Sequence, residues 1–142
     1  MKENNYIEQY QTCIDACTNC SQTCYECFTA CLEEDDVKER ARCVSLLIEC
    51  AKMCEMSAAM MSINAEFVVD CCDLCADICE VCADECETFE DDHCTDCAEV
   101  CRMCADECRN MATGNVSEDE DNEDDDEEET EEDEDENEED DE

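Results

Sequence analysis

The chain has 142 residues, of which 20 are cysteine, and its formal net charge is −41 at pH 7. A chain this acidic repels phosphate backbones and anionic lipid headgroups, so neither nucleic acid nor a membrane is expected as a partner. Leu, Ile, Val and Phe together number only 19, and Trp is absent. These few aliphatic and aromatic side chains are not enough to form an ordinary hydrophobic core in a domain of about 110 residues.

A cysteine content this high is typical of small secreted disulfide scaffolds. Two features argue against that class here. The first residues, Met-Lys-Glu-Asn-Asn-Tyr, form no apolar signal segment, and the chain has one Gly and no Pro for tight turns. We therefore expect free thiols and a cytoplasmic location.

The spacing of the cysteines predicts helices. Most of them recur at alternating steps of three and four residues, which keep side chains on one face of a helix. Free Cys behaves as a small hydrophobe, so sulfur is expected to form the core. The first run is Cys13, Cys17, Cys20, Cys24, Cys27 and Cys31. The later runs are Cys72, Cys75, Cys79, Cys82, Cys86 and Cys94, Cys97, Cys101, Cys104, Cys108.

Four helices are predicted in chain order. The first three cover residues 6–33, 37–62 and 66–88, and the fourth follows the acidic segment 90–92 and ends near residue 112. Asn4 or Asn5 is expected to cap the first helix, Asn64 the third, and the acidic segment 90–92 the fourth. The inward positions of the second helix are predicted to be Cys43, Leu47, Cys50, Cys54, Ala58 and Met61. Leu47 is then a gap in the stripe of thiols.

Short connections make consecutive helices antiparallel. The predicted fold is therefore all-α, an antiparallel up-down-up-down four-helix bundle with a Cys-lined core, over residues 1–114. Residues 118–142 contain 22 acidic residues, interrupted only by Asn122, Thr130 and Asn137. This composition predicts a disordered acidic C-terminal tail over residues 115–142, whose simplest role is solubility.

The two ends of such a bundle differ. One end is predicted to be an apolar plug made of Tyr6, Tyr10, Met61, Val68 and Met111. The other end brings together Cys31, Cys43, Cys86 and Cys94, beside His93, the only histidine. We predict that this Cys/His end is the mouth through which metal enters. The alternative is that His93 is a surface residue with no role in metal binding.

Thiols four residues apart on a helix are neighbours, so two thiolates can share one ion between them. Soft thiolates select Cu(I), Zn or iron–sulfur clusters. The candidate pairs are Cys13/Cys17, Cys20/Cys24, Cys27/Cys31, Cys50/Cys54, Cys75/Cys79, Cys82/Cys86, Cys97/Cys101 and Cys104/Cys108.

Charge favours Cu(I) among these metals. A dry core cannot hold twenty thiolates, since each buried anion costs several kcal/mol. A monovalent ion that replaces one proton per thiol keeps the core neutral, whereas Zn²⁺ on four thiolates leaves two negative charges. The prediction is a cytosolic Cu(I) store with close to one ion per cysteine. A zinc or iron–sulfur protein and a thiol redox buffer remain as alternatives.

No catalysis is expected. The sequence contains no general acid/base pair and no nucleophile with a histidine and a carboxylate, and one histidine supports little chemistry.

Four segments resemble the cysteine-rich four-helix-bundle copper storage proteins of the cytosolic type. They are Cys-Ile-Asp-Ala-Cys-Thr-Asn-Cys (13–20), Cys-Phe-Thr-Ala-Cys-Leu-Glu-Glu (27–34), Cys-Asp-Leu-Cys-Ala-Asp-Ile-Cys-Glu-Val-Cys (72–82) and His-Cys-Thr-Asp-Cys-Ala-Glu-Val-Cys (93–101). The resemblance covers roughly residues 6–112 and implies a lumen that holds many Cu(I) ions, commonly in a homotetramer. Copper donor or acceptor proteins are the other expected partners. The acidic tail is a departure from the family pattern.

The predicted metal ligands are His93 and all twenty cysteines. They comprise the three runs together with Cys43, Cys50, Cys54 and Cys71.

Overall fold

The computed structural model describes residues 5–114. Four α-helices account for most of this range. They are α1 (Asn5–Leu32), α2 (Ala41–Ser62), α3 (Val68–Cys86) and α4 (Asp92–Arg109). A 3-10 helix, η2 (Val37–Arg40), precedes α2, and one π-helical turn, η3 (Asn110–Gly114), follows α4.

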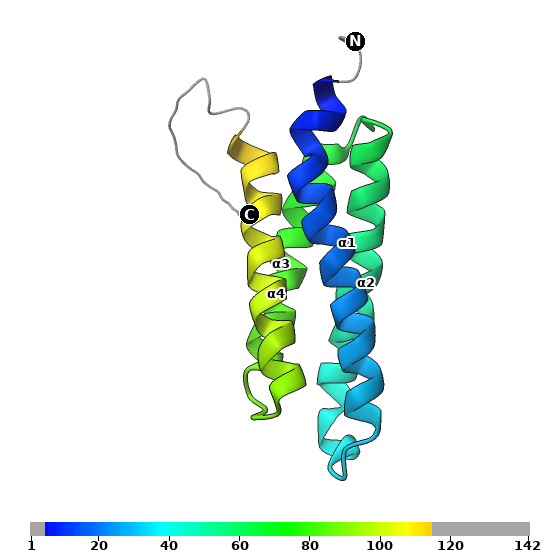
Figure 1. The fold of residues 1–142 in the computed structure, drawn as a ribbon, viewed down its shortest axis with the longest axis vertical. Helices are drawn as coiled ribbons and strands as arrows, with labels where there is room; N and C mark the ends of the chain where they lie inside the picture. Colours follow the sequence, from blue (N-terminus) through cyan, green and yellow to red (C-terminus); the bar gives the residue numbers. More distant parts are fainter. Residues whose placement is uncertain (1–4, 115–142) are drawn as a thin grey trace, which may run out of the picture.

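The helices form an antiparallel bundle in which each helix packs against its neighbours in the chain, and α1 closes the ring against α4 (Figure 1). The α1–α2 and α3–α4 connections lie at the lower end in Figure 1, whereas the α2–α3 connection lies at the upper end. The predicted fold class is therefore confirmed. The predicted tail, residues 115–142, lies outside the described residues.

The helix boundaries differ from the predictions where the backbone makes turns. Residues 37–40, predicted to belong to the second α-helix, form the 3-10 helix instead. Asp91 is the N-cap of α4, in the predicted acidic segment, and its carbonyl accepts hydrogen bonds from the backbone N–H groups of Cys94 and Thr95. Asn5 is the first residue of α1, and Asn4 lies outside the described residues.

Asn64 has a different role from the one predicted. The third helix begins later than expected, with Phe67 rather than Asn64 at its N-cap. Asn64 has φ 50°, in the left-handed region, and directly follows the C-cap of α2. The N–H of Asn64 donates to the carbonyl of Met61, and that of Ala65 donates to the carbonyl of Met60. This is the Schellman arrangement, which Asn tolerates well, so Asn64 terminates α2.

The upper end of the bundle is apolar, as predicted. Met61 and Val68 are buried there, and Tyr10 and Met111 are partly buried against them. The Tyr10 hydroxyl donates a hydrogen bond to Oδ1 of Asn64 at 3.2 Å, which joins α1 to the α2–α3 turn. Tyr6, the fifth predicted member, has no described side chain.

Arginines on the surface join neighbouring helices. Arg102 of α4 lies 2.9 Å from Asp84 of α3, and Arg109 lies 2.9 Å from Glu80 and 3.1 Å from Asp77. Exposed pairs of this kind each contribute less than about 1 kcal/mol. Among the described helices, none combines the length and apolar character needed to cross a bilayer.

Candidate metal centre

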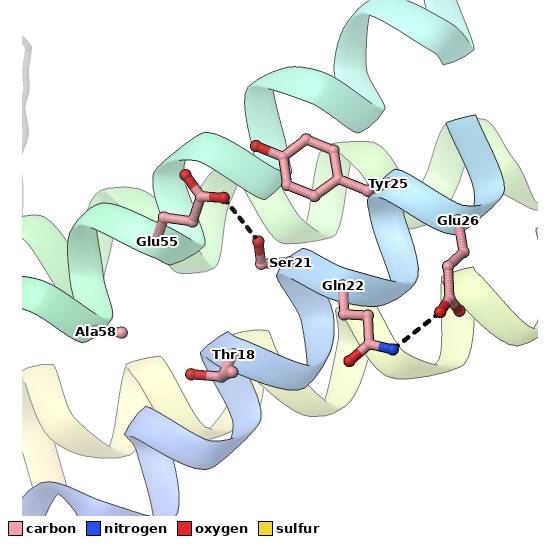
Figure 2. A pocket seen from close by; sticks show the side chains of 7 residues that line it. All are labelled: Thr18, Ser21, Gln22, Tyr25, Glu26, Glu55 and Ala58. Carbon is pink, nitrogen blue, oxygen red and sulfur yellow. Dashed lines mark hydrogen bonds between the residues drawn. The ribbon is translucent and has the colours of Figure 1, made fainter. Parts of the chain in front are cut away.

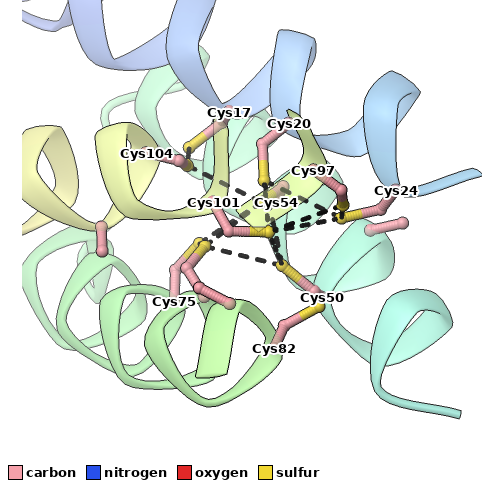
Figure 3. Close-up of a cluster of buried hydrophobic side chains, with 14 of the residues drawn as sticks. Cys17, Cys20, Cys24, Cys50, Cys54, Cys75, Cys82, Cys97, Cys101 and Cys104 are labelled. Atoms are coloured by element: carbon pink, nitrogen blue, oxygen red, sulfur yellow. Dashed lines mark hydrogen bonds between the residues drawn. The ribbon is translucent and has the colours of Figure 1, made fainter. Parts of the chain in front are cut away.

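The interior of the bundle consists mainly of cysteine side chains whose sulfur atoms lie close to one another. All twenty cysteines are free thiols, and nineteen of them belong to one buried cluster with little other than Ala, Leu47, Met61 and Val68. Figure 3 shows thiols of all four helices pointing toward the bundle axis. The prediction that sulfur replaces aliphatic carbon in the core is confirmed.

Most close sulfur–sulfur contacts join different helices. The shortest are Cys17–Cys108 and Cys50–Cys79, both at 3.6 Å. Four of the predicted pairs within one helix also have contacts of 3.9–4.0 Å. These are Cys20/Cys24, Cys27/Cys31, Cys75/Cys79 and Cys97/Cys101. A thiol from a facing helix therefore lies close to each of these four pairs.

The thiols also form groups of four, which overlap. Within each group the ligand atoms lie within 4.8 Å of one another. Three such groups are Cys17/Cys54/Cys75/Cys104, Cys20/Cys24/Cys50/Cys101 and Cys20/Cys50/Cys54/Cys79. Because Cys20, Cys50 and Cys54 each belong to two groups, the three groups cannot all hold separate four-coordinate ions. The geometry therefore favours shared thiolates over isolated tetrahedral sites.

Helix α2 supplies the fewest thiols. Leu47 is fully buried among the cysteines, so the predicted gap in the stripe is confirmed. Ala58, predicted to face inward, is only partly buried, and the neighbouring Ser57 is fully buried instead. Because Cys54 and Met61 are both fully buried as predicted, the difference from the predicted stripe is confined to this one position.

His93 lies at the predicted mouth and faces the thiols. Its Nδ1 is 3.4 Å from Sγ of Cys27 and 3.6 Å from Sγ of Cys94, and its Nε2 is 3.0 Å from a carboxylate oxygen of Glu34. A carboxylate on the outer nitrogen holds the ring with the inner nitrogen directed at the sulfurs. Cys27, Cys31, Cys94 and His93 form one group of potential ligand atoms. Since 27 % of the imidazole side chain is exposed, this group has contact with solvent.

The same end contains a buried cation that sequence reasoning missed. The side chain of Arg40 is 5 % exposed, and its Nη1 donates hydrogen bonds to Sγ of Cys94 at 3.5 Å and of Cys31 at 3.7 Å. Burial lowers the pKa of Arg40, but the hydrogen bond to Asp36 and the ion pair with Asp91 raise it above its ordinary value. The only local signal in the sequence was the spacing of Asp36 and Arg40, four residues apart.

Burial opposes ionisation of the two thiols that Arg40 contacts at the mouth, Cys31 and Cys94. Burial raises the pKa of Cys94 to about 12, and the neighbouring Cys31 adds to this effect. Burial also raises the pKa of Cys31, although the hydrogen bond from Arg40 opposes the change. Deeper in the lumen, hydrogen bonds from Cys101 and Cys24 lower the pKa of Cys82 to about 6, whereas the pKa of Cys24 is raised. Hydrogen bonds between inner thiols thus shift the pKa values of neighbouring cysteines in opposite directions.

Cys71 is the one cysteine outside the buried cluster. It is 8 % exposed, and its sulfur lies 3.4 Å from the hydroxyl of Ser57. The adjacent Cys72 is fully buried and interacts with Cys108 and Cys13. Neighbouring residues on α3 thus place one thiol inside the lumen and one at its edge.

We expect Cys71→Ser to leave the copper capacity unchanged and Cys72→Ser to lower it by about one ion, because a hydroxyl is a poor ligand for Cu(I). The measurement is the number of Cu(I) ions bound per chain at saturation, determined by elemental analysis of the desalted protein. The two substitutions are chemically identical, so each is the control for the other. Equal losses in both variants would contradict the placement of Cys71.

An external groove between α1 and α2 has a volume of about 500 Å³. Its lining differs from the thiol lining of the lumen. Figure 2 shows its polar lining, in which Ser21 donates to Glu55 at 3.3 Å and Gln22 donates to Glu26 at 2.9 Å. The residues that line it include no sulfur ligand. The candidate metal centre is therefore the lumen.

Comparisons with known proteins agree with this geometry. The family model described as copper storage protein matches residues 6–113. Apo-Csp3 (copper storage protein 3) from Bacillus subtilis is 42 % identical, with a TM-score of 0.70, over 73 % of this chain and 99 % of that one. Cu(I)-bound BsCsp3 is also 42 % identical, with a TM-score of 0.71, over 73 % of this chain and 98 % of that one.

A more distant structure is that of a cytosolic copper storage protein from Streptomyces lividans, described with five coppers. It is 33 % identical, with a TM-score of 0.71, over 75 % of this chain and 94 % of that one. The search of curated proteins finds no match.

Proposed function

Because the chain belongs to the copper storage protein family, we propose that it fills its lumen with Cu(I) to a level near one ion per cysteine. As a member of this family it is a non-enzymatic metal store that binds several Cu(I) ions through thiolates inside the bundle. The observation that carries the proposal is the sharing of Cys20, Cys50 and Cys54 between groups of four thiols. Shared thiolates suit a soft monovalent ion at high loading.

The proposed ligands are the lumen thiols, with His93 at the mouth. Free thiols persist in a reducing compartment, and the similar protein from Streptomyces lividans is cytosolic, so we place this store in the cytoplasm. Exchange of copper with donor and acceptor proteins belongs to the same proposal. An anaerobic titration of the reduced protein with Cu(I) tests the capacity: saturation near 20 ions is expected, and saturation at four or five would contradict it.

A homotetramer is the second part of the proposal. Its support is an apolar strip on the outside of α2 and α3, where Met56 and Leu74 are each 51 % exposed and Val81 is 40 % exposed. Beside the strip lies a shallow groove of about 310 Å³ that Met53, Met56 and Ile78 help to line. Exposed apolar surface of this kind is typical of contacts between copies of a chain.

We expect the reduced protein to sediment as a tetramer and the double variant Leu74→Glu/Val81→Glu to sediment as smaller species. The physical reason is that a carboxylate buried in an apolar interface lacks a partner. Met103→Glu is the matched control, because Met103 is 63 % exposed on α4, away from the strip. Sedimentation velocity measures all three proteins. A monomeric parent protein would contradict the tetramer, and equal dissociation of both variants would contradict the position of the interface.

A further inference from the structure

The Cys/His mouth contains a fixed positive charge, and its position is set by three contacts. Nε of Arg40 lies 2.6 Å from Asp36, Nη2 lies 2.6 Å from Asp91, and the guanidinium carbon lies 4.3 Å from the centre of the Phe89 ring. These contacts hold two edges and one face of the guanidinium. The remaining nitrogen, Nη1, is directed at two sulfurs.

Those sulfurs are Cys31 and Cys94, which lie 3.8 Å from each other. Arg40 makes the only guanidinium–thiol hydrogen bonds among residues 5–114. His93 approaches the same group from another side, and its imidazole is the more exposed of the two basic groups. The route from solvent to these sulfurs therefore passes His93, whereas the side chain of Arg40 is buried on another side of them.

The first ion to bind in the lumen creates a charge. When one Cu(I) binds two thiols, two S–H bonds break, two Cu–S bonds form and two protons leave, so that Cu⁺ and two thiolates together carry one negative charge. Burying that charge is unfavourable unless a cation lies beside it. Later ions bind to thiolates that have already formed and release fewer protons, so that at one ion per thiol the core is neutral again.

Resting on the proposed function, we propose that Arg40 is a positioning residue for copper capture: its guanidinium balances the anionic Cu(I) complex of Cys31 and Cys94 and makes this pair the site of the first ion. Hydrogen bonds from a charged donor to an anion are shorter and stronger than hydrogen bonds between neutral groups. Both hydrogen bonds from Nη1 therefore become stronger when Cu(I) binding converts the thiols to thiolates. No inner thiol pair of the described chain has such a donor.

The test measures the affinity for the first ion by competition with a chromophoric Cu(I) chelator, at less than one Cu(I) per chain. We expect Arg40→Met to weaken this affinity on the order of tenfold, since a unit charge a few ångströms from a buried anion interacts strongly with it. Arg40→Lys should retain at least about a third of the affinity, because an ammonium keeps the charge but not the planar fork. Capacity at saturation should stay unchanged in both variants.

Arg42→Met is the control, since Arg42 pairs with Glu85 on the surface and its side chain is 64 % exposed. An Arg40→Met variant with normal capacity and the first-ion affinity of the parent protein would overturn the inference. If Arg40→Met does not fold, NMR of the unmodified protein with ¹³Cβ-labelled cysteine decides. With half an equivalent of Cu(I), the signals of Cys31 and Cys94 should shift first, and earlier shifts of inner cysteines would overturn the inference.

The two proposals fail separately. Saturation of the unmodified protein at four or five ions contradicts the storage capacity. If the unmodified protein saturates near 20 ions but binds the first ion at inner thiols, only the proposed role of Arg40 is contradicted.

Discussion

Saturation with Cu(I) is expected to raise the midpoint of thermal unfolding by at least about 15 °C. A ligand that binds the folded state at 1,000 times its dissociation constant stabilises that state by about 4 kcal/mol per site. For a domain of roughly 100 residues, each kcal/mol raises the midpoint by about 4–8 °C. The lumen offers many sites, but the unfolded chain also binds Cu(I) through its thiols, which reduces the gain.

The physical reason lies in the core. Leu47 and Met61 are its largest fully buried side chains, and the rest is mostly thiol and Ala. Cysteine buries little apolar area, so the metal-free bundle has a modest hydrophobic contribution to its stability. Cu–S bonds between helices then connect elements that otherwise meet through sulfur contacts of 3.6–4.0 Å.

The measurement is the far-UV circular dichroism of the reduced protein during heating without oxygen, at increasing copper content. The midpoint should rise with each addition until saturation and then remain constant. Metal-free protein with excess chelator is the control. A constant or falling midpoint would contradict a folded store in which copper joins the helices.

The cumulative number of protons released per bound Cu(I) is expected to fall from about two for the first ions to about one at saturation. The first ions each bind two thiols, whereas at one ion per thiol each ion has on average replaced a single proton, so the last ions release fewer than one. The raised pKa of Cys94, about 12, means that this thiol is protonated at neutral pH. Protons then compete with copper at every pH below that value, so the apparent affinity at the mouth should fall as pH is lowered.

The anaerobic titration measures this when it is run in weak buffer with a pH indicator, so that bound metal and released protons are counted together. Zn²⁺ on the same protein is the comparison, and it should saturate at four or five ions and release more protons per ion than Cu(I). Constant release of four protons per Cu(I), with saturation near five ions, would contradict shared thiolates and favour isolated four-cysteine sites. Little metal binding together with ready disulfide formation would favour the redox buffer.

Much of the site was predictable because helical periodicity is a local property of the chain. Steps of three and four residues place Cys13 and Cys31 on one face whatever surrounds the helix. The same reasoning located the gap at Leu47, the apolar end at Met61, and the meeting of His93 with Cys94 at the other end. Short connections were sufficient to predict the antiparallel order of the helices.

Other features depended on contacts between helices. The spacing of residues along one helix does not predict such contacts. Packing against the neighbouring helices buried Ser57 more fully than Ala58 and left Cys71 at the edge of the lumen. Asn64 was expected to begin a helix, but the direction of the α2–α3 turn required a left-handed residue there.

By itself, the sequence determined a sulfur-filled four-helix bundle, because the helical repeat and the scarcity of aliphatic residues permit little else. Only the tertiary structure decided which thiols meet. The contact between Cys17 and Cys108 and the hydrogen bonds from Arg40 to Cys31 and Cys94 join residues that lie 91, 9 and 54 positions apart. Such contacts depend on how the helices are rotated and shifted against one another, and packing of the whole bundle sets both.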